Sequence, residues 1–276
     1  MGKKITILKA TGEKAPFSED KYRLSLHKSG ATDDQINSIL NEIMPQLHDG
    51  MSTRDIYAKT HELMRKKKMF SSGGRYHLRQ AILDLGPTGF PFEHFIAKVM
   101  EAQGFKTLID QTISGTCIRH EIDVIAINGD KKLFIECKFH NSPGERCSIK
   151  TTLYVKARHD DIVGHTKKIN YQHCYLVTNA KFSSESIDYG KCIGMNLLGW
   201  AYPHNNGLEK IIDTVGLHPI TCLSSISKKL VHELVQRGII FCHELVQNSS
   251  LLHQLGLKEA ETRELLEECG AILRLK

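Results

Sequence analysis

Three charged residues in the middle of the chain have the types and spacing that hydrolysis of a phosphodiester bond requires: Asp123, Glu136 and Lys138. Side chains two residues apart on a strand share a face, so Glu136 and Lys138 would point the same way, about 6.6 Å apart. Residues 128–130 read Asn-Gly-Asp, a turn typical of a β-hairpin, and this hairpin would bring Asp123 beside Glu136. The residues that alternate with these side chains along the two strands are apolar, so the opposite face suits burial.

This set of side chains is typical of metal-dependent hydrolysis. Without a catalyst the reaction is so slow that the barrier must fall by about 20 kcal/mol. A hard divalent cation polarises the phosphoryl oxygens and generates hydroxide from bound water. Because Mg²⁺ and Mn²⁺ take oxygen ligands, we expect Asp123 and Glu136 to hold one of them. Lys138 would orient the attacking water or stabilise the developing charge. The alternative is a solvated strand face with a weak ion pair.

The elements that would position these residues alternate between helix and strand. Residues 92–103 predict a helix, because Phe92, Phe95, Ile96, Val99 and Met100 fall on one face. The expected order after it is strand 121–127, strand 133–139, helix 159–168, strand 174–178, helix 183–191 and a further element at 195–200. This order indicates a mixed α/β core.

With its carboxylates and Glu-x-Lys, the stretch from Gly89 to Trp200 resembles the Mrr-type branch of the PD-(D/E)xK restriction endonuclease-like nucleases. Three segments carry the resemblance: Phe92-Glu93, Ile135-Glu136-Cys137-Lys138 and Leu176-Val177-Thr178-Asn179. It implies DNA as the substrate and Glu93 as a further metal ligand. Glu121-Ile122 stands where the family usually has Pro-Asp or Gly-x-Asp before the first carboxylate. This departure leaves open whether Glu121 also contacts the metal.

Basic residues follow the motif, and Lys150, Lys156 and Arg158 are expected to contact DNA phosphates. A solvated helix face explains half of the basic residues in this stretch equally well. His120 and His140 flank the motif and are alternative metal ligands. Packing or contact with DNA is the other interpretation of these two histidines.

The N-terminal region resembles an ATP-cone, a nucleotide-sensing module, at Lys9, Gly12, Phe17 and Lys21. The resemblance implies that ATP or dATP binds as an effector. Ala10 replaces the usual arginine of the pattern. The expected elements are a strand at 3–9, a turn at 12–16 and helices at 18–29, 33–47, 52–67 and 73–84, with Ser52-Thr53 capping the third helix. A small helical adaptor with a basic surface is the alternative.

The C-terminal region begins near Pro219 and is expected to be helical. Leu255-Gly256-Leu257 between two helices resembles a helix-hairpin-helix, which contacts DNA phosphates without reading sequence. The same tripeptide also ends ordinary helices. Packing against protein is therefore the other interpretation of this region.

The composition of the chain excludes several kinds of protein and of binding site. The 276 residues carry a net charge of +6, and most of the excess lies in residues 1–86, which hold 15 Lys and Arg against 10 Asp and Glu. No P-loop motif occurs and no run of 18 apolar residues suggests a membrane span. Eight cysteines without a Cys-x-x-Cys pair argue against a zinc site and indicate free thiols in a reducing cytoplasm.

The sequence thus predicts an α+β or α/β multidomain protein. Its expected domains are a mostly helical ATP-cone with a small sheet at 1–86, a restriction endonuclease-like α/β core at 87–215 and an all-α domain at 216–276. The expected function is a divalent-metal-dependent DNA endonuclease regulated by an adenine nucleotide. The alternative is a non-catalytic, nucleotide-responsive DNA-binding regulator that uses the nuclease fold as a platform. A homo-oligomer is left open.

Overall fold

The computed structural model describes residues 5–86, 90–142, 144–165 and 173–273. The chain forms two compact units, one made of residues 1–81 with 218–276 and the other of residues 82–217. Helices and strands occur together, as the predicted fold class requires. The division into three domains stays a prediction. No described helix is long and apolar enough to cross a membrane.

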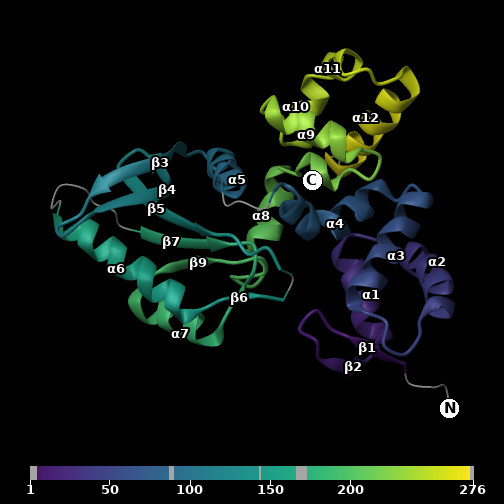
Figure 1. Cartoon of the computed structure of the whole chain (residues 1–276), viewed down its shortest axis with the longest axis horizontal. Helices are drawn as coiled ribbons and strands as arrows, with labels where there is room; N and C mark the ends of the chain where they lie inside the picture. The colour runs from purple at the N-terminus through teal and green to yellow at the C-terminus, as the bar shows by residue number, and fades with distance from the viewer. Residues whose placement is uncertain (1–4, 87–89, 143, 166–172, 274–276) are drawn as a thin grey trace. The chain divides into compact units, whose positions relative to one another are not determined.

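The N-terminal part of the first unit is a β-hairpin followed by helices (Figure 1). Its elements are β1 (Thr6–Leu8), β2 (Lys14–Pro16), α1 (Glu19–Lys28), α2 (Asp33–Ile43), the 3₁₀ helix η1 (Met44–Gln46), α3 (Thr53–Lys66) and α4 (Phe70–Asp84). The helices bury an aliphatic core that includes Leu26, Ile36, Ile43 and Met64. All four predicted helices are confirmed, whereas β2 forms where only a turn was expected.

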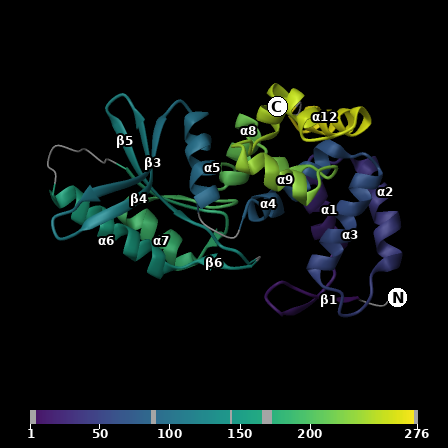
Figure 2. The ribbon, with the colours of Figure 1, turned by 45° about the horizontal axis from the view of Figure 1, so that its top comes forward.

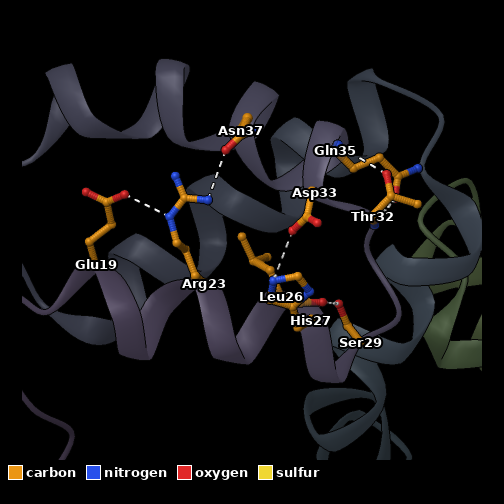
Figure 3. Close-up of polar contacts among 9 residues, drawn as sticks. All are labelled: Glu19, Arg23, Leu26, His27, Ser29, Thr32, Asp33, Gln35 and Asn37. Carbon is orange, nitrogen blue, oxygen red and sulfur yellow. Dashed lines mark hydrogen bonds and ion pairs between the residues drawn. The ribbon is translucent and has the colours of Figure 1, made fainter.

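Local capping explains where these helices begin. Thr32 accepts the backbone N–H of Gln35 at 3.3 Å, and the Gln35 side chain accepts the N–H of Thr32 at 3.1 Å (Figure 3). Ser52 caps α3 as predicted, since its hydroxyl accepts the N–H of Asp55. Arg23 of α1 reaches Glu19 at 2.8 Å and Asn37 of α2 at 2.9 Å, which joins the two helices at the surface (Figure 3).

The C-terminal part of the same unit is helical, as predicted. It contains the 3₁₀ helix η2 (Ile220–Cys222), α9 (Lys228–Gln236), α10 (Cys242–Gln247), α11 (Ser250–Gln254) and α12 (Glu259–Leu273). Glu268 is buried, and its two oxygens accept the backbone N–H and hydroxyl groups of Ser224 and Ser225 at 2.6–2.9 Å. The Thr221 hydroxyl donates to the Ala81 carbonyl at 2.7 Å, so this part contacts α4 directly.

The second unit is built on a five-stranded sheet with the order β3-β4-β5-β7-β9. The strands are β3 (Lys106–Ser114), β4 (Arg119–Asn128), β5 (Lys131–Lys138), β7 (His173–Thr178) and β9 (Asn196–Leu198). The pairs β3–β4 and β4–β5 are antiparallel, and the pairs β5–β7 and β7–β9 are parallel. Two short strands, β6 (Arg146–Cys147) and β8 (Lys181–Phe182), form a separate pair.

Helices pack on this sheet and bury its apolar side chains. These helices are α5 (Phe90–Glu101), α6 (Ile149–His165) and α7 (Ser184–Ile193), and the short helix α8 (Leu208–Val215) contacts α5. Figures 1 and 2 show α6 and α7 side by side along the sheet, with α5 apart from them. Val155 and Ile162 of α6 pack with Ile122 and Phe134 in one apolar cluster. The five apolar residues expected on one face of α5 are all buried.

Candidate active site

The hairpin of β4 and β5 brings the predicted acidic residues together. Gly129 adopts a positive φ of 58° in the turn, and the strands pair from Asn128–Lys131 as far as Val124–Ile135. Asp123 and Glu136 are each the next residue beyond that last pair. They therefore stand opposite one another where the two strands part, as the sequence predicts.

A cleft of about 430 Å³ opens at this point. Its lining includes Glu93 from α5, Asp123 from β4, Glu136 and Lys138 from β5, and Lys150 and Tyr154 from α6. Segments separated by some sixty residues of sequence therefore supply carboxylates and an amine to one space. The four residues expected to catalyse or bind metal all line it.

Asp123 is fixed by the main chain of the neighbouring strand. Its Oδ2 atom accepts the backbone N–H of Cys137 at 2.6 Å, and the side chain is half-buried. Burial raises the pKa of Asp123, although the bond from Cys137 and the charge of Arg158 act in the opposite direction. This bond replaces a ladder contact that the parting strands no longer provide.

Glu136 is the most deeply buried acid of the site, with 8% of its surface exposed. Its Oε2 atom forms an ion pair with Nη1 of Arg158 at 2.6 Å, whereas Oε1 is buried with no hydrogen-bond partner among the described residues. Burial, followed by the charge of Asp123, raises the pKa of Glu136 to about 8, against the lowering effect of Arg158. Its charged form is therefore poorly stabilised without a further cation.

Two further acids belong to this environment. Burial raises the pKa of Glu93 to about 7, and the charges of Asp123, Asp110 and Glu121 and a hydrogen bond with Asp110 add to the effect. Asp110 lies between the β3–β4 pairs Ile109–Val124 and Gln111–Ile122, which places it opposite Asp123. It has a left-handed φ of 54°, which is uncommon for a residue other than glycine. Asp110 was not among the predicted site residues, because β3 was not predicted.

The three expected DNA contacts occupy different environments. Lys150 is exposed in the cleft. Lys156 pairs with Asp160 of its own helix at 2.5 Å, and only Arg158 reaches a carboxylate of the cleft. Within α6 these residues therefore do not form a uniform basic face.

The two histidines considered as ligands have acidic partners outside the cleft lining. His120 lies 2.7 Å from Asp161 and His140 lies 3.0 Å from Glu145. The main chain of His140 is also bound on both sides by the amide of Asn179, at 2.8 and 2.9 Å. These contacts favour packing for both histidines, although Nε2 of His140 is buried with no hydrogen-bond partner among the described residues.

The donor set of the cleft fits a hard divalent cation. Asp123, Glu136 and Glu93 supply carboxylate oxygens, which Mg²⁺ and Mn²⁺ prefer, and Oε1 of Glu136 is a buried acceptor without a donor. In the described part of the chain, no three Asp, Glu, His or Cys side chains are gathered closely enough to hold a metal ion as they stand. A cation here would complete its coordination with water and substrate oxygens.

The residues expected to bind nucleotide lie around the N-terminal hairpin. Lys9 and Gly12 are in the β1–β2 turn, where Gly12 has a φ of 83° and Lys9 pairs with Glu13 at 2.9 Å. Phe17 packs against the helical core, 5.8 Å from the Tyr22 ring. Lys21 is in the first turn of α1. In the C-terminal region, the predicted turn glycine, Gly256, joins α11 and α12 with a φ of 83°.

Comparisons with known proteins support part of these expectations. Residues 87–198 match the family model described as restriction endonuclease, and residues 218–273 match the model described as AF1548-like, C-terminal. An uncharacterized protein of Archaeoglobus fulgidus is 35% identical over 179 residues, which cover 64% of this chain and 99% of that protein. A crystal structure of a protein of unknown function, AF1548, superposes with a TM-score of 0.55 at 34% identity, over 67% of this chain and 98% of that one.

These matches confirm the restriction endonuclease-like resemblance of the central region. Neither family model reaches residues 1–86, so the ATP-cone resemblance stays a prediction. The C-terminal match is to an AF1548-like domain, and the helix-hairpin-helix resemblance likewise stays a prediction.

Proposed function

Because this chain belongs to the AF1548-like family and carries a restriction endonuclease-like domain, we propose that it is a DNA endonuclease that requires a divalent metal ion. The observation that carries the proposal is the convergence of Glu93, Asp123, Glu136 and Lys138 in one cleft. DNA is the substrate class that a restriction endonuclease-like domain implies.

Each residue of the cleft has a distinct proposed role. Asp123, Glu136 and Glu93 would hold Mg²⁺ or Mn²⁺, which when bound supplies Lewis acidity and lowers the pKa of water. The Cys137 N–H fixes Asp123 in place, since it donates to Oδ2 at 2.6 Å. Lys138 is exposed at the cleft, where it can donate to the attacking water or to the phosphoryl oxygens. Lys150 would bind a phosphate at the cleft entrance.

Cleavage assays test this proposal directly. Duplex, single-stranded and branched DNA would be incubated with Mg²⁺, Mn²⁺ or chelator, using the wild type, Asp123→Ala and the control Asp188→Ala. Asp188 is an exposed acid of α7 in the same unit. We expect cleavage by the wild type and the control only, and only with metal. Equal cleavage by Asp123→Ala, or cleavage in chelator, would exclude this site.

Lys138→Ala separates catalysis from binding. If Lys138 acts on the transition state, its loss lowers the turnover rate and leaves metal and DNA affinity largely intact. A parallel loss of DNA binding would make it a phosphate contact instead. DNA binding without cleavage under every condition would favour the non-catalytic regulator.

The N-terminal region is the proposed site of an adenine nucleotide effector. Support comes from Gly12, whose positive φ allows close approach of backbone amides to phosphates, and from Lys9 and Lys21 as charges. Calorimetry on the full chain with ATP and dATP, with Lys9→Ala/Lys21→Ala as the control, tests binding. We expect cleavage rates to rise or fall by roughly 5- to 150-fold at most on saturation. Proven binding with an unchanged rate would remove the regulatory role.

A further inference from the structure

Arg158 differs from the other basic residues of α6 in what it contacts. Its guanidinium pairs with Glu136 of β5 at 2.6 Å and also donates to the main-chain carbonyl of Glu121 on β4. The same group lies over the Tyr154 ring, 5.4 Å from its centre. By contrast, the ammonium group of Lys156 bonds, among the described residues, to Asp160 of its own helix alone. Arg158 thus ties the helix to both strands that carry the predicted metal ligands.

Three contacts of different direction leave the guanidinium little freedom. Its side chain is 13% exposed, whereas that of Lys156 is 28% exposed. A planar group held by a carboxylate, a carbonyl and an aromatic face is fixed in both position and orientation. A residue that bound DNA phosphates would instead direct its donors toward the open cleft.

The fixed guanidinium in turn restrains the carboxylate of Glu136. Because Oε2 is held by Arg158, the carboxylate cannot turn freely, and no described residue donates to the buried Oε1. An unsatisfied buried acceptor of this kind destabilises the folded protein, and more so when it is charged. A bound cation would remove that effect. The ion pair therefore holds the carboxylate with one oxygen occupied and the other available.

We propose that Arg158 is a positioning residue, which orients Glu136 so that its free oxygen can ligate the metal ion. This inference rests on the proposed function, because it assumes that Glu136 is a ligand. It assigns Arg158 a role other than the phosphate contact expected from the sequence. Residues that orient metal ligands typically contribute 10- to 100-fold to metal affinity when tested by mutation.

Metal binding without substrate provides the readout. The dissociation constant for Mn²⁺ would be measured by calorimetry on the full chain, for the wild type, Arg158→Ala, Arg158→Lys and Arg119→Ala. Arg119 is an exposed arginine on β4 of the same unit, so its loss removes the same charge without these contacts. DNA affinity would be measured in parallel with Ca²⁺, by fluorescence anisotropy.

We expect Arg158→Ala to weaken Mn²⁺ binding by roughly 10- to 100-fold, with Arg158→Lys between it and the wild type. Arg119→Ala should match the wild type, and DNA affinity should change little in any variant. Unchanged or tighter Mn²⁺ binding by a folded Arg158→Ala would overturn the inference. If that variant does not fold, Arg158→Lys decides on the same criterion.

The results distinguish a failure of this inference from a failure of the proposed function. A wild type that binds no Mn²⁺ and cleaves no DNA overturns the proposed function, and this inference with it. A wild type that binds Mn²⁺ and cleaves, with Arg158→Ala of equal Mn²⁺ affinity but weaker DNA binding, overturns only the inference. That outcome would return Arg158 to the role of a phosphate contact.

Discussion

The buried Glu136 predicts an unusual dependence of stability on pH. Its pKa is about 8 in the folded chain, against 4.5 as its ordinary value. A carboxyl group with a raised pKa binds more protons when folded than when unfolded between these two values. The free energy of unfolding therefore falls as pH rises through this window, which is the reverse of the usual behaviour of a salt-bridged acid.

The size of the effect follows from the same numbers. A group that is protonated only in the folded state changes the free energy of unfolding by about 1.4 kcal/mol per pH unit. Between pH 5 and 8 we therefore expect Glu136 to contribute a loss on the order of 4 kcal/mol in the metal-free protein. Saturating Mn²⁺ should shrink this loss, because a cation favours the charged carboxylate.

The chain contains a suitable probe. Its single tryptophan, Trp200, is buried in the unit that holds the cleft, so its fluorescence reports unfolding of that unit. Urea unfolding would be measured from pH 5 to 8 for the wild type, Glu136→Gln and the exposed-acid control Asp188→Asn. The stability advantage of Glu136→Gln over the wild type should grow steadily with pH.

Titrating groups that do not interact with Glu136 affect all the variants alike, so the difference between variants reports Glu136 together with Asp123 and Glu93, whose charges act on it. A difference between Glu136→Gln and the wild type that stays constant, or narrows toward pH 8, would refute the reasoning. The same holds if Asp188→Asn shows the pH trend that is expected of Glu136→Gln.

Three further predictions follow from single residues. Asp110→Gly should have a free energy of unfolding about 1 kcal/mol higher than Asp110→Ala, because only glycine adopts the positive φ of 54° at this position without strain. Urea unfolding followed by the fluorescence of Trp200 measures the difference, and equal stabilities of the two variants would contradict the prediction. Glu268→Ala should cost about 1–3 kcal/mol, since it removes the shared acceptor of four part-buried donors on Ser224 and Ser225. A thermal melt by circular dichroism unchanged from the wild type would show that water replaces the carboxylate. The pKa of Asp161 is lowered to about 2, mainly by its bond to His120, so its carboxylate should stabilise the fold above pH 4 and lose that effect as pH falls toward 2. Asp161→Asn should therefore lessen the acid-induced decrease in stability. An acid profile identical to that of the wild type would contradict this role of Asp161.

Local signals explain what was predictable in the cleft. Asn128-Gly129-Asp130 specifies a hairpin by turn chemistry, and strand alternation then fixes which residues share a face, so the opposition of Asp123 and Glu136 follows. The buried face of α5 follows in the same way from its helical period. These are properties of short segments, which the sequence encodes directly.

The missed features depend on neighbours or on weak local preference. Strand β3 carries Gln111 among the inward positions and Asp110 at a left-handed φ, so its apolar alternation is broken. Helix α6 begins at Ile149, ten residues before the predicted start, where Thr151, Thr152 and Val155 lower the helical preference. The contact between Arg158 and Glu136 links a helix to a strand, and no local pattern encodes it.

The first unit is assembled from segments that the ribosome makes far apart in time. Residues 1–81 emerge before the whole of the second unit, and residues 218–276 emerge after it. Helix α4 cannot bury Gly74 against Ile272, or accept the Thr221 hydroxyl at Ala81, until that last segment exists. The second unit, which is one continuous segment, can therefore fold during synthesis while the N-terminal helices still lack part of their packing. Truncation before residue 218 would leave those helices permanently in that incomplete state.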